Sequence, residues 1–141
     1  MKVRPFMEGD YDAIRLVSCN AMGTTRLFDN RERARDTGGL SLLLNNELVG
    51  YATWDDVGLE LTDLAILPQL ARWLAPVFIS DVLLHTLNRG RWTAVLHRDI
   101  ILPMFEQVTR SLGLYVEHVE EIYKPAENVV FQRVCWAYRS K

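Results

Sequence analysis

Cysteine is scarce in this sequence, and its scarcity excludes several kinds of site. Among 141 residues only Cys19 and Cys135 are cysteines, and neither has the clustered spacing with cysteine or histidine that a zinc site requires. We therefore expect no metal site. We expect both cysteines to be buried free thiols, in a helix and a late strand, with a disulfide as the lesser alternative.

An excess of basic charge and a long apolar run are also missing. The formal net charge is −2, and Arg31, Arg33 and Arg35 alternate with Glu32 and Asp36, which is typical of a solvated helix face. This pattern argues against nucleic-acid binding. The longest apolar stretch, residues 73–84, contains a proline, a serine and an aspartate, and no apolar leader opens the chain. We expect no membrane contact and a cytoplasmic protein.

The composition that is present is typical of a globular domain. Hydrophobic residues make up 49% of the chain and charged residues 24%. The length suits one domain, residues 1–141, with a single succession of elements and no repeat or linker.

Hydrophobic periodicity and turn residues predict the order of these elements. Strands are expected at residues 2–4, 40–44, 48–54, 59–66, 91–97, 114–123 and 129–138, with a hairpin turn at residues 45–47. Helices are expected after Asp10 as the capping residue, at residues 30–36, from Pro76 or Val77 to residue 87, and at residues 100–112. The residues predicted to be buried are Ile14, Val17, Val49, Tyr51, Leu64, Ile66, Val82, Leu83, Val95 and Val108.

Three local sequences carry a resemblance to a known family. Residues 3–14 read Val-Arg-Pro-Phe-Met-Glu-Gly-Asp-Tyr-Asp-Ala-Ile, residues 48–52 read Leu-Val-Gly-Tyr-Ala after a polar turn, and residues 105–114 are a helix that ends in Ser-Leu-Gly-Leu. In their order and spacing, over nearly the whole chain, they resemble the GNAT superfamily of N-acetyltransferases. The resemblance implies an α/β (α+β) fold with a mixed, mostly antiparallel central sheet of about six to seven strands, flanked by about four helices.

The resemblance also implies an acetyl-CoA site at residues 66–76. Family members that use acetyl-CoA have Arg or Gln, two residues, Gly, one residue, and Gly or Ala after the fourth strand, so that backbone amides approach the pyrophosphate closely. Aligned on Gln69, this chain has Arg72 and Leu74 at the small-residue positions. We expect acetyl-CoA to bind weakly or not at all, with Ile66, Gln69, Ala71 and Arg72 as the cofactor-binding residues.

Candidate catalytic groups are few. Family members often have a tyrosine four residues before the glycine that ends the fourth helix, where it protonates the departing thiolate, but here that residue is Thr109. Glu60 and Asp63 are candidate bases, and their odd spacing predicts opposite faces of a regular strand. His97 is a third candidate because it ends a strand. A paired or solvated carboxylate and a hydrogen-bonded histidine are the structural alternatives.

Two functions from different classes follow from these observations. The first is a divergent N-acyltransferase with a degenerate pyrophosphate loop, which either still transfers an acyl group to an amine or has lost catalysis. The second is a non-catalytic binding or structural protein of the same fold, such as the small GNAT-like proteins of bacteriophages, which the chain resembles in size and layout. Trp73, with Leu70 and Leu74, either fills the core or anchors an interface with a protein partner or a second copy of the chain.

Overall fold

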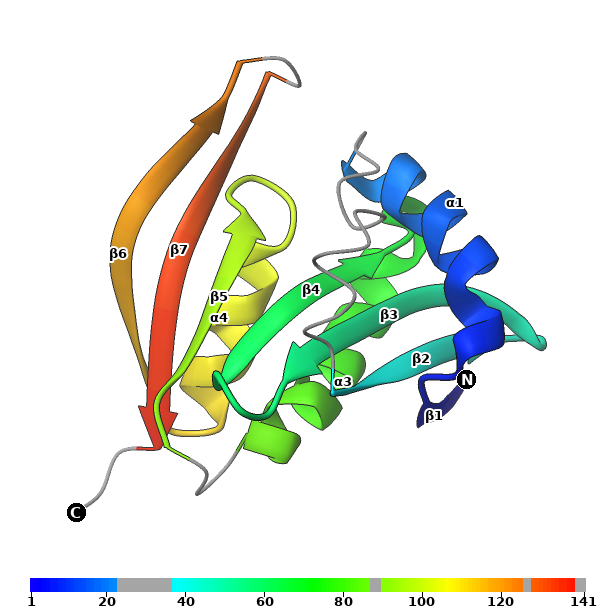
Figure 1. Cartoon of the computed structure of the whole chain (residues 1–141), viewed down its shortest axis with the longest axis horizontal. Helices are drawn as coiled ribbons and strands as arrows, with labels where there is room; N and C mark the ends of the chain where they lie inside the picture. Colours follow the sequence, from blue (N-terminus) through cyan, green and yellow to red (C-terminus); the bar gives the residue numbers. More distant parts are fainter. Residues whose placement is uncertain (23–36, 87–89, 126–127, 139–141) are drawn as a thin grey trace.

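Seven strands form one mixed sheet in the computed structural model, which describes residues 1–22, 37–86, 90–125 and 128–138 (Figure 1). The strand order is β1-β2-β3-β4-β5-β7-β6, and each neighbouring pair is antiparallel except β4 with β5. This confirms the predicted sheet. The strands are β1 (Lys2–Pro5), β2 (Gly38–Leu44), β3 (Glu47–Asp55), β4 (Glu60–Ile66), β5 (Trp92–His97), β6 (Leu114–Lys124) and β7 (Val129–Tyr138).

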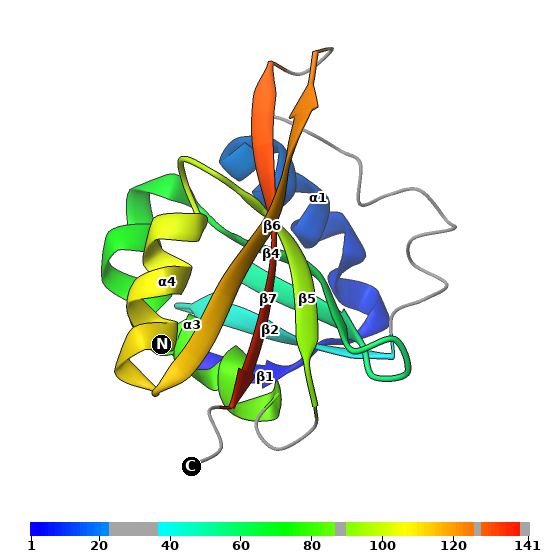
Figure 2. The same ribbon diagram turned by 90° about the vertical axis from the view of Figure 1, so that its left-hand side faces the viewer.

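Helices cover both faces of this sheet. The helix α1 (Tyr11–Met22) lies on one face, and α3 (Pro68–Thr86) and α4 (Leu102–Ser111) lie on the other (Figure 2). The described residues thus hold three α-helices and one short 3-10 helix, Glu8–Asp10, where four helices were predicted. The predicted helix at residues 30–36 lies outside the described residues. Within the described part of the chain, no helix is both long and apolar enough to cross a membrane.

Asp10 was predicted to cap the first helix, but its carboxylate instead accepts from the Met7 amide at the start of the 3-10 helix that precedes α1. Asp10 precedes α1 and is only 8% exposed. It accepts two hydrogen bonds from the Arg4 guanidinium, at 2.7 and 2.8 Å, one from the Met7 amide and one from the Ser41 hydroxyl. These contacts join β1, β2 and the start of α1, and they lower the pKa of Asp10 to about 2, chiefly through Arg4.

The predicted hairpin joins β2 to β3. Asn45 and Asn46 have φ values of 52° and 64°, in the left-handed region that asparagine tolerates. Two such residues in succession give the tight turn whose twist matches antiparallel strands. The loop therefore has two residues, and Glu47 already belongs to β3.

A hydrophobic core lies on each face of the sheet. The larger one packs α3 and α4 against the strands, and the smaller one packs Ile14 and Val17 of α1 against Tyr51, Ala65 and Phe131. All predicted core residues are buried except Val95, which is partly buried. Cys135 is a buried free thiol, as predicted, and the side chain of Cys19 lies outside the described residues.

The predicted start of α3 was wrong. The helix begins at Pro68 rather than at Pro76 or Val77, because a proline fits the first helical position. Pro76 lies inside the helix, where it has no N–H to donate to the Arg72 carbonyl. The outer side of the helix is apolar and exposed: Trp73 is 73%, Val77 48% and Leu84 52% exposed. Trp73 therefore does not fill the core.

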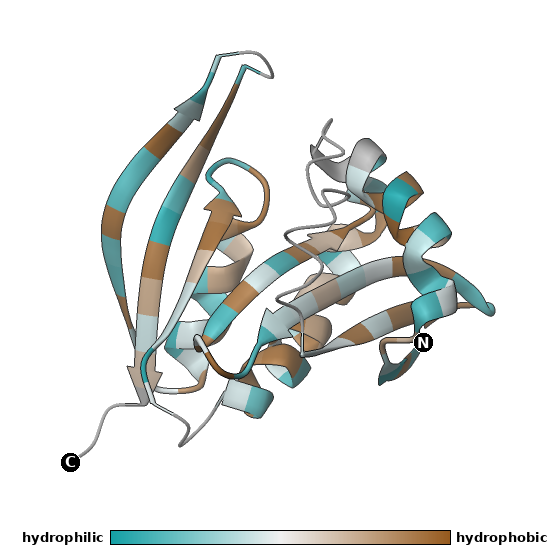
Figure 3. Ribbon diagram, viewed as in Figure 1, coloured by the Kyte–Doolittle hydropathy of each residue, from teal (hydrophilic) through white to brown (hydrophobic). Residues whose placement is uncertain are grey.

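The strand β6 forms one edge of the sheet and is largely exposed. Hydrophilic and hydrophobic residues alternate along it (Figure 3). Its pairing with β7 shifts between His118 and Glu120, which marks a β-bulge. Glu120 pairs with Arg133 of the neighbouring strand β7 at 2.8 Å, and Glu117 and Glu121 pair with Arg91 and Arg98, which flank β5.

Candidate functional site

The two parallel strands of the sheet pair only at their beginnings. The register between β4 and β5 consists of Glu60↔Thr93 and Leu61↔Ala94, after which the strands diverge toward their carboxyl ends (Figure 1). We call the diverging segments, residues 62–66 of β4 and 95–97 of β5, the β4–β5 fork. Such a fork leaves strand edges that do not pair with each other.

The β4 side of the fork presents backbone groups to it. The Leu67 amide donates to the Val49 carbonyl of β3 at 2.9 Å. Backbone groups alternate in direction along an antiparallel strand, so Leu64 and Ile66 turn their N–H and C=O groups away from β3 and into the fork. Both residues are buried.

The β5 side has the same property. The Thr93 amide donates at 3.0 Å to the Leu59 carbonyl, on the β4 side of the strand. By the same alternation, the His97 amide also faces the fork, whereas the Val95 amide belongs to the Leu61↔Ala94 pairing with β4. Because buried backbone groups require hydrogen-bond partners, an extended ligand with alternating donors and acceptors fits between these two strand edges.

A cavity of about 440 Å³ lies where the fork opens, between the first turns of α3 and α4. Pro68 follows the end of β4, and Asp99 follows the end of β5. The cavity therefore continues from the wide end of the fork. Its lining residues are Pro68, Ala71, Arg72, Pro76, Asp99, Ile100, Met104 and Gln107.

The first turn of α3 contains no glycine loop. Helix α3 starts two residues after β4 ends, and the amides of Leu70 and Ala71 both donate to the Leu67 carbonyl, at 2.9 and 3.0 Å. These two amides are thus satisfied within the chain. Arg72 brings a positive charge to the cavity, with its guanidinium carbon 5.8 Å from the centre of the Trp73 ring.

The predicted cofactor-binding residues lie close together. Ile66 faces the fork through its backbone, Ala71 and Arg72 line the cavity, and Gln69 is exposed on the turn between them. The start of α3 has no glycine at these positions, and its Leu70 and Ala71 amides already donate to the Leu67 carbonyl. Arg72 is the side chain in this segment with charge suited to phosphate.

The two candidate carboxylates share a face of the sheet, and the prediction of opposite faces was wrong. The pairing of β3 with β4 shifts by one residue, so that Thr62 forms a bulge. Leu61 and Leu64 both pack in the core on the α3 side. Their neighbours Glu60 and Asp63 therefore both point to the α1 side.

Asp63 is a paired carboxylate. It is 9% exposed, its Oδ2 accepts a hydrogen bond from the Tyr51 hydroxyl at 2.7 Å, and its Oδ1 accepts one from the Leu64 amide at 2.7 Å. The second contact places the carboxylate at the edge of the fork, because the Leu64 amide faces it. Glu60, the first residue of β4, is partly exposed at the narrow end of the fork.

His97 caps the start of the loop that leads to α4. Its Nδ1 accepts hydrogen bonds from the Asp99 and Ile100 amides, each at 3.2 Å, and its ring contacts Phe131 edge-on. This network assigns the proton of the neutral ring to Nε2. Burial lowers the pKa of His97, so the neutral form is favoured at pH 7. His97 thus offers an N–H donor in this arrangement, rather than a base.

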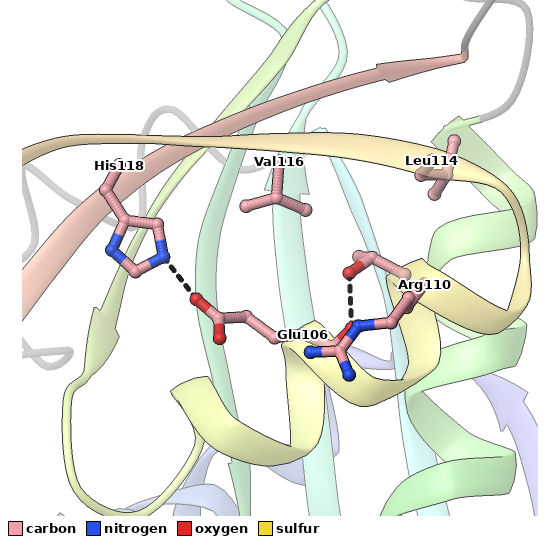
Figure 4. A pocket seen from close by; sticks show the side chains of 6 residues that line it. Glu106, Arg110, Leu114, Val116 and His118 are labelled. Carbon is pink, nitrogen blue, oxygen red and sulfur yellow. Dashed lines mark hydrogen bonds and ion pairs between the residues drawn. The ribbon is translucent and has the colours of Figure 1, made fainter.

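The position predicted for a catalytic acid lies on the other side of α4. Thr109 is 1% exposed, and its hydroxyl donates to the Glu106 carbonyl at 2.8 Å. It lines a separate cavity of about 270 Å³ between α4 and β6, which is crossed by a hydrogen bond between His118 and Glu106 (Figure 4). Among the described residues, no group of three or more His, Cys, Asp or Glu side chains could hold a metal ion.

Sequence comparison finds no match to a family model and none to a curated protein. Comparison with solved structures does find matches over nearly the whole chain. The ribosomal-protein-S18-alanine N-acetyltransferase of Escherichia coli matches with a TM-score of 0.64 and 12% identity, over 99% of this chain and 96% of the other.

Two further structural matches are an enzyme named for spermidine and a complex with coenzyme A. A mutant of the spermidine N-acetyltransferase from Vibrio cholerae matches with a TM-score of 0.61 and 14% identity, over 95% of this chain and 91% of the other. A PaiA N-acetyltransferase from Thermoplasma acidophilum, in complex with coenzyme A, matches with a TM-score of 0.57 and 10% identity, over 94% and 98%. This chain therefore has the GNAT acetyltransferase fold.

Proposed function

We propose that this protein is a divergent N-acyltransferase that binds an acyl-CoA along the β4–β5 fork and transfers the acyl group to an amine. The observation that carries this proposal is the fork itself, whose two edges turn the amides of Leu64, Ile66 and His97 into the space between the strands. Amide and thioester carbonyls of a CoA arm would accept from such donors. The coenzyme A complex of a structural neighbour supports this choice of ligand.

Arg72 is the residue we assign to the phosphates. In place of close backbone contacts it provides a single exposed cation. One charge-assisted contact is weaker than a cradle of several amides, so the pyrophosphate site is degenerate and acetyl-CoA binds weakly.

The acceptor amine approaches from the α1 side, where Glu60 and Asp63 both point. Its nitrogen attacks the thioester carbonyl carbon, and the proton lost by the amine leaves through one of these carboxylates. The carbon–sulfur bond breaks with its electron pair on sulfur, and the CoA thiolate departs and takes a proton from water. Spermidine and a peptide that begins with alanine are suitable first acceptors, because two structural neighbours are named for such amines.

Calorimetry with acetyl-CoA tests the binding step. We expect a dissociation constant weaker than about 1 μM. Arg72→Ala should weaken binding further, by about 1.5 kcal/mol, the lower end for a charge-assisted contact because Arg72 is exposed. Arg110→Ala is the matched control, since Arg110 is also exposed but lines the separate cavity between α4 and β6. Micromolar or tighter binding would refute the degenerate site.

A second function is supported by the bonding of the candidate catalytic groups. Asp63, His97 and Thr109 each have hydrogen bonds within the chain, as a purely structural role requires. The alternative is a non-catalytic binding or structural protein of this fold. Release of free CoA thiol from acetyl-CoA, measured with and without spermidine or the peptide, separates the two: binding without amine-dependent release favours the alternative.

A further inference from the structure

The carboxylate of Asp63 occupies the deepest backbone donor of the β4–β5 fork. Of the two β4 amides that face the fork, Ile66 lies at the wide end and Leu64 lies nearer the point where the strands meet, at Leu61 and Ala94. The Leu64 amide already donates to Asp63 Oδ1 at 2.7 Å. A ligand carbonyl reaching this depth must displace the carboxylate.

The carboxylate is held in place from its other side. The Tyr51 hydroxyl donates to Asp63 Oδ2 at 2.7 Å, and Tyr51 is fully buried in the core beneath α1. The Thr62 bulge turns Asp63 to this side of the strand, within reach of Tyr51. Asp63 therefore lies between a fixed phenol and the fork amide, and its Oδ1 contact involves a group that the ligand needs.

The order of groups in the ligand determines which carbonyl competes with Asp63. The cavity that suits a nucleotide lies at the wide end of the fork, so the arm enters there with its acyl end deepest. Leu64 and Ile66 are two residues apart, or roughly 7 Å along a strand. The thioester carbonyl and the nearest amide carbonyl of the arm are separated by a comparable chain of single bonds. The thioester carbonyl therefore accepts from the Leu64 amide.

We infer that Asp63 is an internal competitor for the acyl carbonyl, which makes the site discriminate against acyl-CoA relative to free CoA. This inference rests on the proposed function. When the thioester carbonyl accepts from the Leu64 amide, Asp63 Oδ1 loses this donor on the side from which the amine approaches. Binding of the acyl group and release of this carboxylate are thus one event.

The test compares two variants that differ only in the carboxylate. Tyr51→Phe is the reference, and Tyr51→Phe/Asp63→Ala is the variant, so that neither protein has a buried hydroxyl deprived of its acceptor. Acetyl-CoA and CoA are titrated by calorimetry into both. We expect removal of the carboxylate to tighten acetyl-CoA binding roughly tenfold, the effect of one hydrogen bond to a charged group, and to change CoA binding less than about twofold. Asp63→Asn in the otherwise unchanged protein should shift the ratio of acetyl-CoA affinity to CoA affinity in the same direction.

The Leu64 amide itself provides a second readout. In a ¹⁵N-labelled protein its proton resonance should move when Asp63 is replaced, and acetyl-CoA but not CoA should move it in the reference protein. The competition is refuted if CoA binds and the ratio of the acetyl-CoA and CoA affinities is the same in all variants. It is also refuted if the Leu64 resonance does not move when Asp63 is replaced. In both cases the proposed ligand stands. If neither compound binds any variant, the proposed function itself is refuted and the competition with it.

Discussion

Replacing Asp10 by asparagine should destabilise the protein through a group far from the fork. The carboxylate accepts hydrogen bonds from Arg4, Met7 and Ser41, and it is only 8% exposed. Asparagine keeps the shape but removes the charge and one acceptor atom. The substitution therefore tests whether this carboxylate anchors β1, β2 and the start of α1 together.

The expected loss follows from the pKa of Asp10. That pKa is lowered from 3.8 to about 2 in the folded protein, so the ionised form gains roughly 2 kcal/mol on folding. A lowered pKa gives stability that is fully present above the unfolded value and is lost as the pH falls through the folded value. The free energy of unfolding of the wild type should thus exceed that of Asp10→Asn by about 2 kcal/mol at pH 7. This difference should shrink as the pH falls from about 4 to about 2.

Urea unfolding followed by circular dichroism, at pH 7 and at steps down to pH 2.5, measures this difference. Asp12→Asn is the matched control, because Asp12 is an exposed residue in the first turn of α1. Its replacement should change the free energy of unfolding by no more than about 0.5 kcal/mol. A loss of similar size for both variants, or a loss for Asp10→Asn that does not change with pH, would show that the charge of Asp10 does not anchor these elements.

Two further predictions concern the two sides of α3. Leu83→Ala should lower the free energy of unfolding in urea by about 2 to 5 kcal/mol, because Leu83 is fully buried. Leu84→Ala should change it by about 0.5 kcal/mol or less, because Leu84 is 52% exposed. Equal losses would contradict this orientation of the helix. We also propose that the exposed stripe of Trp73, Val77 and Leu84 pairs with a second copy of the chain. Light scattering should then give a dimer for the wild type and a folded monomer for Trp73→Glu, and a wild type that stays monomeric at high concentration would rule out self-association.

Most strands and the hairpin could be predicted because local signals determine them. Asn45 and Asn46 tolerate left-handed backbone conformations, and the apolar runs on either side alternate as a half-buried sheet requires. The start of α3 could not be predicted in this way. That helix is apolar on nearly every side, so it has no clear polar face to mark its period, and Pro76 resembles a first-turn proline.

The sequence could place the candidate residues on their strands but could not predict their geometry. Glu60 and Asp63 were identified from their place on a strand, yet a bulge at Thr62 changes which way they point, and no residue type signals such a bulge. The Nδ1 contacts of His97 depend on how the loop after β5 turns. The direction of the Leu64 amide depends on the pairing register, which the sequence alone does not reveal.

The exposed edge of β6 has a consequence for how copies of this protein meet. The outer edge of an 11-residue edge strand is a template on which another chain can extend the sheet, and such extension leads to aggregation. Here the edge has a bulge near Val119 and carries Glu117, Glu120 and Glu121, so a second identical edge would bring like charges and mismatched hydrogen bonds together. We expect concentrated solutions to resist sheet-mediated fibril growth, which leaves the helical side of the molecule as the route for specific association.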